Sequence, residues 1–201
     1  MKNKLTTNYQ LLTTNLKGGL TLVELLIAFS IIGLVSILVA AVYFAHSRLF
    51  SNQNTSIDVA SQNRLALDEM TNQIREAQTI LQGCPPCQPP ETTSTSVLIL
   101  QIWPIDLNGE PFQPTWPNLG DVIIYKKNSD KLIKKIIPGA GSSREAGEEI
   151  IATGISDLQF TYDNADYTLS SEMSISLTTS ANSGGKTITS TQTSKAVLRN
   201  K

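Results

Sequence analysis

The sequence has very few of the side chains that catalytic and metal sites use most. Among its 201 residues there are one histidine, His46, and two cysteines, Cys84 and Cys87. A structural zinc site needs about four nitrogen or sulfur ligands, which this set does not supply. A Ser-His-Asp or Cys-His site would have to use His46, which ends a long apolar run and cannot reach a pocket elsewhere in the chain. We therefore expect no enzyme, no metal and no cofactor.

Nucleotide-binding and calcium-binding motifs are also missing. Gly184-Gly185-Lys186-Thr187 ends like a phosphate-binding loop, but Ser180 occupies the position of that loop's first glycine, and no apolar strand leads into a helix here. A group of oxygen-bearing side chains could supply ligands to calcium, but it does not have the spacing of an EF-hand loop, and we favour solvated strand ends. These residues are Asp157, Asp163, Asn164 and Asp166.

Charge is absent from one long segment. From Leu25 to Ala45 there is no charged side chain, and at ~1.5 Å per residue this segment spans roughly the ~30 Å core of a bilayer. Residues 1–19, further towards the N-terminus, include Lys2, Lys4 and Lys17 and no acid. The positive-inside rule therefore predicts a single-pass protein with a cytoplasmic N-terminus and an extracytoplasmic C-terminal domain.

One acid, Glu24, stands at the start of the apolar segment. A carboxylate costs about 2.5–3.5 kcal/mol at the centre of a membrane and less near the interface, so an unpaired one is expected to have a partner or a function. Gly18-Gly19 would interrupt a helix and leave the backbone accessible to a protease. Cleavage after Gly19 would create an ammonium group at Leu20, one helical turn from the otherwise unsatisfied Glu24 carboxylate.

The stretch Gly19-Leu20-Thr21-Leu22-Val23-Glu24 resembles the type IV prepilin signal: a basic leader, a glycine, a glutamate at fixed spacing and a long apolar run. The resemblance implies that a prepilin peptidase cuts after Gly19 and that Leu20 becomes the N-methylated first residue. It also implies that Glu24 meets the terminal amine of a neighbouring subunit during filament assembly. The resemblance covers about the first third of the chain.

The same resemblance implies partners and a location. The partners are other pilin or pseudopilin subunits, the prepilin peptidase and an inner-membrane assembly platform. The subunit is expected first in the inner membrane and then in a pilus or a type II secretion pseudopilus. An ordinary secretory signal peptide and an uncleaved signal anchor are the alternatives. The long apolar run, Glu24 and the lack of a small-x-small cleavage site argue against a secretory signal.

The domain organisation follows from these features. Cleavage would leave 13 basic and 17 acidic side chains, and a mildly acidic domain is a poor nonspecific binder of nucleic acid. We expect an α+β fold in which a long N-terminal helix packs on an antiparallel sheet. The predicted parts are a leader (1–19), a membrane and assembly helix (20–45), an amphipathic extension of the same helix (46–82) and a β-rich globular domain (83–201).

The amphipathic extension has apolar residues at intervals of three or four, which predicts one buried stripe. Gly83 and the prolines behind it predict the end of the helix. The predicted stripe consists of Phe50, Ile57, Ala60, Leu67, Met70, Ile74, Ala77 and Leu81.

Segments rich in β-branched residues predict the strands of the C-terminal domain, with hairpin turns at residues 128–130 and 182–185. Two segments rich in Pro, or in Gly and Ser, predict surface loops at 104–120 and 138–147. The predicted strands are Ser96 to Trp103, Asp121 to Lys127, Lys131 to Ile137, Gly154 to Asp163, Met173 to Thr179 and Lys186 to Leu198.

Cys84 and Cys87 form a CxxC motif. In the cytoplasm this spacing would indicate a redox pair or half a zinc site. Outside the cytoplasm it indicates a short local disulfide that holds the turn after the helix. The disulfide would close a very small loop, so its entropic stabilisation should be modest.

Within the family, the layout is most similar to J-type minor pseudopilins and W-type minor pilins. The features are the helix segment from Gln62 to Met70, a strand from Ile155 to Tyr162 and the strand end at residues 196–200. We therefore expect a minor subunit that helps to initiate or cap the filament. The alternatives are a major pilin, or a membrane-anchored binding module whose aromatic ligand surface consists of Trp103, Phe112 and Trp116.

Overall fold

The computed structural model describes residues 19, 21–84, 87, 89–114 and 120–199. The chain divides into two compact units, Met1–Ser47 and Arg48–Lys201. The predicted division at residue 19 and the other domain boundaries stay predictions. We call the described part of the second unit the ectodomain and treat each unit separately.

A single helix, α1 (Leu22–Glu76), contributes to both units. Within the ectodomain its buried face begins at Val59 and continues to Ile74. The predicted stripe is right for Leu67, Met70 and Ile74. It is wrong for its first members, because Phe50 and Ile57 are each 65% exposed. The apolar core of the ectodomain begins further along α1 than periodicity alone indicated.

The helix ends at Glu76, earlier than the predicted residue 82. The sheet takes over the backbone hydrogen bonds here: the Gln78 N–H donates to the Gln101 carbonyl at 2.8 Å, and the Leu81 N–H donates to the Ile99 carbonyl at 2.9 Å. Strand β1 (Thr79–Ile80) lies between these bonds. Strand pairing therefore competes successfully with helix propagation and ends the helix six residues before the predicted residue 82.

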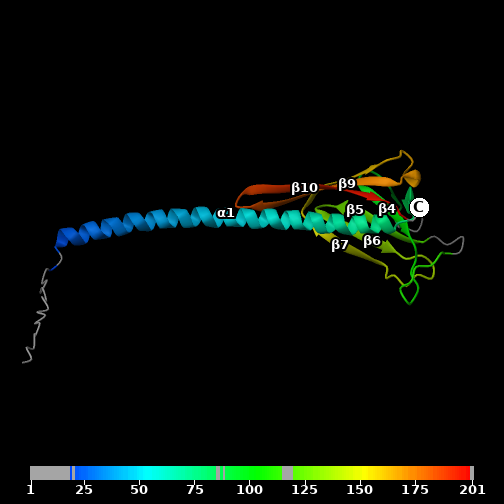
Figure 1. Ribbon diagram of the computed structural model, residues 1–201, viewed down its shortest axis with the longest axis horizontal. Helices are drawn as coiled ribbons and strands as arrows, with labels where there is room; N and C mark the ends of the chain where they lie inside the picture. The colour runs from blue at the N-terminus through cyan, green and yellow to red at the C-terminus, as the bar shows by residue number, and fades with distance from the viewer. Residues whose placement is uncertain (1–18, 20, 85–86, 88, 115–119, 200–201) are drawn as a thin grey trace, which may run out of the picture. The chain divides into compact units, whose positions relative to one another are not determined.

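Five strands form an antiparallel sheet in the order β1-β4-β5-β6-β7 (Figure 1). The hairpin predicted at residues 128–130 joins β5 to β6, with Asn128 opposite Lys131 and Ser129 at φ 57°. Strand β7 is an additional edge strand, which the sequence did not predict. The strands after β1 are β4 (Val97–Ile102), β5 (Asp121–Asn128), β6 (Lys131–Ile137) and β7 (Gly147–Thr153).

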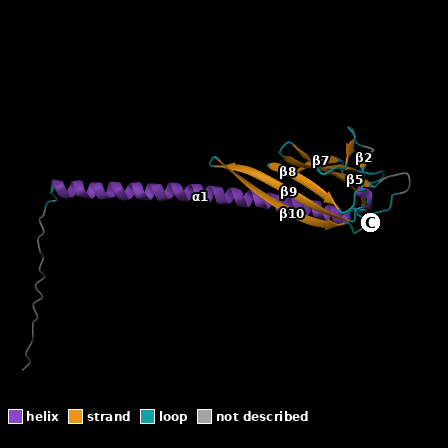
Figure 2. Ribbon diagram, turned by 90° about the horizontal axis from the view of Figure 1, so that it is seen from above, coloured by secondary structure: helices purple, strands orange, loops and turns teal. Residues whose placement is uncertain are grey.

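Three further strands form a second antiparallel sheet, in the order β10-β9-β8. The predicted second hairpin joins β9 to β10 through Gly184 and Gly185, both with positive φ, which suits a tight two-residue turn. Figures 1 and 2 both show this hairpin running beside α1. The strands are β8 (Ile155–Tyr162), β9 (Glu172–Ser183) and β10 (Lys186–Val197); a 3-10 helix, η1 (Tyr167–Leu169), precedes β9, and β2 (Gly83–Cys84) pairs with β3 (Glu91–Thr92).

The main core lies where α1 meets the sheets, and it includes Met70, Tyr125 and Phe160. One polar residue, Asn63, is fully buried in this contact; its side-chain amide donates to the Ser190 carbonyl at 2.7 Å and its oxygen accepts from the Thr179 hydroxyl. These bonds satisfy the amide where it faces the sheet, as a buried polar group requires. The predicted α+β class, with one long helix packed on antiparallel strands, is confirmed.

Candidate functional site

The first turn of α1 is closed by two residues of the predicted signal, Thr21 and Glu24. The Thr21 N–H donates to Glu24 Oε2 at 2.9 Å, and the Thr21 hydroxyl donates to the same oxygen at 3.0 Å. In return the Glu24 N–H donates to Thr21 Oγ1 at 3.3 Å. Thr21 and Glu24 therefore form a capping box, in which the N-cap and the third helical residue satisfy each other's backbone donors.

This geometry corrects the expectation that the Glu24 carboxylate is unsatisfied before cleavage. Sequence reasoning considered only its charge and looked for a counter-charge at Leu20. It missed Thr21, although the T-x-x-E spacing that signals a capping box is present in Thr21-Leu22-Val23-Glu24. The helix N-terminus also carries partial positive charge, which favours a carboxylate in the first turn.

Behind this cap, α1 presents apolar side chains on all sides. None of the most apolar stretch of α1 is buried within the subunit. A helix that is apolar all round and unburied is what a membrane span requires. By length and composition α1 can therefore cross a bilayer, which fits a membrane-anchored single-pass protein.

Two serine hydroxyls inside this apolar segment are satisfied by the helix itself. The Ser30 hydroxyl donates to the Leu26 carbonyl at 2.8 Å, and the Ser36 hydroxyl donates to the Ile32 carbonyl at 2.7 Å. Such bonds to the carbonyl four residues back remove the need for an external partner in lipid. Glu24 is therefore the one charged side chain between Leu22 and Ala45.

The predicted cleavage site is only partly within the described residues. Gly19 is exposed, and a Cβ added to it would meet nothing within 4 Å. Leu20, the predicted new N-terminus and methylation site, lies outside the described residues. Cleavage between Gly19 and Leu20 therefore stays a prediction.

Cys84 and Cys87 are joined by a disulfide with a Cα–Cα distance of 5.3 Å. Both are buried, in a second apolar cluster on the face of β4 and β5 that includes Ile99 and Val122. The disulfide thus forms part of a small core to which β2 contributes Cys84. Whether it forms in the cell stays a prediction.

The oxygen-bearing residues near η1 are engaged in local hydrogen bonds. The Asp163 carboxylate accepts from the backbone N–H groups of Ser171 and Glu172. Burial raises the pKa of Asp163, but the hydrogen bonds from Ser171 and Glu172 outweigh it and hold the pKa below its ordinary value. Asp166 caps η1 by accepting from the Thr168 N–H at 3.0 Å. Within the described ranges, no three His, Cys, Asp or Glu side chains gather in a way that could hold a metal ion.

The proposed aromatic surface is only partly described. Trp103 lines a cavity with Pro111 and Arg144. Phe112 lies over Gly141, and its N–H donates to the Pro104 carbonyl at 3.0 Å. Trp116 lies outside the described residues. The aromatic ligand surface therefore stays a prediction.

Comparison with known proteins bears on the N-terminal segment. Residues 14–40 match the family model described as the prokaryotic N-terminal methylation motif. No curated protein and no solved structure matches the chain, so the similarity to J-type or W-type subunits has no support from these comparisons. A pilin-type motif points to a structural protein rather than an enzyme. The match supports a type IV pilin-like prepilin signal, and the apolar helix fits a membrane-anchored single-pass protein.

Proposed function

We propose that this chain is a minor pilin or pseudopilin subunit, cleaved after Gly19, methylated on Leu20 and assembled through α1 into a filament. The methylation motif supports this proposal most directly, because it coincides with a capped apolar helix that has one acid in its first turn. The ectodomain is the part that meets neighbouring subunits outside the membrane. The match covers only the N-terminal motif and does not distinguish minor from major subunits. The minor role therefore rests on the layout of the helix and strands predicted from the sequence.

The capping box supports a specific role for Glu24. Within the subunit, Thr21 satisfies Glu24 Oε2 through two hydrogen bonds but supplies no charge. Cleavage after Gly19 leaves an ammonium group at Leu20, directly before Thr21. A neighbour's ammonium then offers Glu24 an ion pair, which is far stronger in a low-dielectric surrounding than in water. Assembly thus exchanges a neutral partner for a charged one, and this is a structural mechanism without turnover.

The N-terminus of the mature protein tests this proposal. Mass spectrometry of the full chain, recovered from membranes of cells that have a prepilin peptidase, should identify N-methyl-leucine at residue 20. A Gly19→Val variant should keep the leader, because a branched side chain would occupy the cleavage position. Gly18→Ala is the control and should be processed normally. A mature wild-type chain that begins at Met1 would contradict the proposal.

A further inference from the structure

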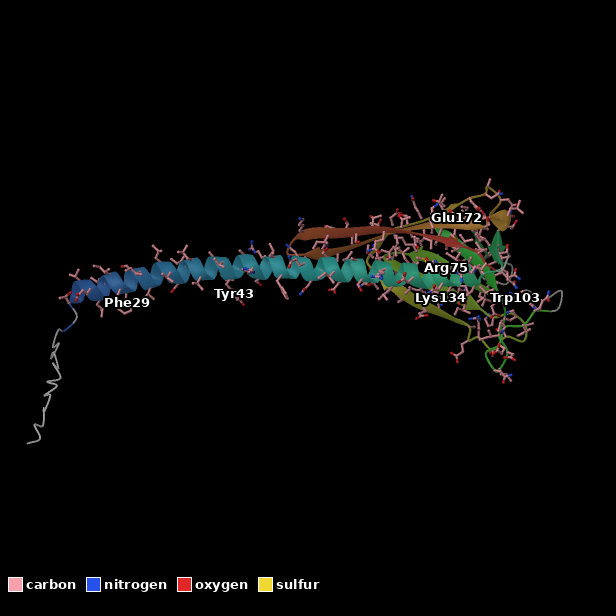
Figure 3. The ribbon with its side chains drawn as sticks, viewed as in Figure 1. Phe29, Tyr43, Arg75, Trp103, Lys134 and Glu172 are labelled. Carbon is pink, nitrogen blue, oxygen red and sulfur yellow. A yellow bond between two sulfur atoms is a disulfide. The ribbon has the colours of Figure 1, made fainter. Side chains whose placement is uncertain are left out.

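Two adjoining hollows lie where α1 ends in the ectodomain. One has a volume of about 250 Å³, and its described lining consists of Glu76, Ile102, Trp103, Pro111 and Arg144. The other has a volume of about 370 Å³ and is lined by Asn72, Arg75, Glu76 and Arg199. Because Glu76 lines both, we treat them as one surface and call it the α1-end groove. Figure 3 shows Arg75 and Trp103, the labelled residues of the two hollows, at the same end of the ectodomain.

The first hollow is held in place by a buried carboxylate. Asp121 is fully buried, and it accepts from the Gly139 N–H at 2.7 Å and from the Ser142 hydroxyl at 2.8 Å. Its other neighbour is Arg144, whose Nε lies 2.8 Å from Asp121 Oδ2. This network fixes Arg144 and its loop beside Trp103. The hollow is thus a preformed cavity with an indole ring and a positioned guanidinium group.

The second hollow brings two arginines together. The Arg199 N–H donates to the Arg75 carbonyl at 3.3 Å, which holds the C-terminal strand end against the last turn of α1. Neither guanidinium group forms an ion pair with another described residue. Arg75 and Arg199 therefore present positive charge that no described carboxylate neutralises at short range.

The charge of this surface differs from that of the rest of the ectodomain. From Arg48 onward the chain has 13 basic and 16 acidic side chains. Three of its five arginines nevertheless line the α1-end groove: Arg75, Arg144 and Arg199. Glu76 also lines the groove, and the buried Asp121 pairs with Arg144, so the described charges at this surface sum to about +1. Arginine and tryptophan are the residues that most often dominate binding energy at protein interfaces. Guanidinium groups also pair well with carboxylates, which they can bind through two parallel hydrogen bonds.

We propose that the α1-end groove is a docking surface for an acidic segment of a neighbouring subunit. Carboxylates of that segment pair with Arg75 and Arg199, and an adjacent apolar side chain enters the hollow at Trp103 and Pro111. The volume of about 250 Å³ is sufficient for one large apolar side chain. This inference rests on the proposed function only in taking the partner to be another subunit.

A labelled peptide tests the groove separately from filament assembly. The full chain in detergent micelles is titrated into fluorescein-Glu-Glu-Glu-Leu-Leu, and binding is followed by fluorescence anisotropy. Saturable binding is expected. The double variant Arg75→Glu/Arg199→Glu should raise the Kd by about tenfold or more, as removal of paired charges at an interface does. Trp103→Ala should raise the Kd as well, because it removes the apolar side of the site.

The matched control is Arg48→Glu/Arg64→Glu, which makes the same charge change at two exposed arginines of α1 outside the groove. It should change the Kd by less than about twofold, since screened surface charges contribute little. If Arg75→Glu/Arg199→Glu unfolds the chain, Arg75→Gln/Arg199→Gln is the substitute. An equal loss in the control variant would overturn the inference. So would absence of saturable binding, or tighter binding of a single-stranded oligonucleotide of equal charge.

The two proposals can fail independently. If the mature chain begins at Met1 but the peptide binds in the groove, the α1-end groove does bind acidic segments and the filament proposal is wrong. If N-methyl-leucine is found but the peptide does not bind, the filament proposal stands and the groove inference is wrong.

Discussion

At the scale of single residues, Glu24 has an uncharged partner, Thr21, within the subunit. The capping box with Thr21 stabilises the first turn of α1 and holds the carboxylate at the helix start. A sequence shows charges directly, so the acid without a counter-charge was evident. The hydrogen bonds that satisfy it depend on local backbone geometry, and only the T-x-x-E spacing signalled them.

The charge and the cap of Glu24 can be separated by substitution. Glu24→Gln keeps a side-chain oxygen that can accept from the Thr21 N–H, as glutamine does in capping boxes, but it cannot form an ion pair with an amine. We expect Glu24→Gln and Glu24→Ala to leave membrane insertion intact and to reduce recruitment into filaments to a similar extent. Recruitment is measured as the fraction of the full chain that co-purifies with sheared filaments.

Thr21→Ser is the control for this comparison, because serine keeps both the hydroxyl and the cap. It should be recruited like the wild type. Unchanged recruitment of Glu24→Ala would contradict our proposal that the charge of Glu24 is needed for assembly. Loss in Glu24→Ala alone, with normal recruitment of Glu24→Gln, would assign the effect to the cap instead.

At the scale of elements, the crossing from one sheet to the other depends on a single glycine. Gly154 is the only residue between β7 and β8, and its φ is +70°. Its carbonyl accepts from the Ser180 N–H at 2.7 Å, which draws the two backbones together. A Cβ at this position would lie 2.8 Å from the Ser180 carbonyl oxygen. Both the left-handed backbone and the close approach therefore require glycine.

Gly154→Ala should consequently destabilise the ectodomain by about 1–3 kcal/mol, the usual range for a non-glycine residue held in a strained backbone region. The measurement is urea unfolding of the full chain in micelles, followed by tryptophan fluorescence. Gly147→Ala is the matched control at the start of β7, since an added Cβ there meets nothing within 4 Å and the φ is not positive. Equal unfolding midpoints for the two variants would contradict this account of the crossing.

The sequence predicted most of the strands but missed one strand and the end of the helix. The six predicted strands all exist, and both hairpin turns lie where Asn, Asp and Gly indicated them. Strand β7 was missed because Glu148 and Glu149 interrupt its apolar pattern, and its pairing with β6 is a tertiary effect. The helix end was missed for a related reason: the strand partners of residues 78–81 lie about twenty residues further along the chain.

At the scale of the whole molecule, the charge distribution and the two cysteines together predict how the chain is oriented across the membrane. Residues 1–19 have three lysines and no acid, so the positive-inside rule predicts a cytoplasmic N-terminus. The ectodomain would then fold in an oxidising compartment, where a disulfide between Cys84 and Cys87 persists. In the cytoplasm the same pair would be kept reduced.

The state of these two cysteines therefore reports orientation. Cells are quenched in acid to stop thiol exchange. The full chain is then denatured and treated with a maleimide, and its mass is measured by mass spectrometry. We expect no maleimide without prior reduction and two per chain after it, because denaturation removes the protection that burial gives both sulfur atoms. A variant without the apolar segment, which would stay in the cytoplasm, is the control and should take up two maleimides without reduction. Two maleimides on the unreduced wild-type chain would place the ectodomain in the cytoplasm and would contradict both the orientation and the assembly that depends on it.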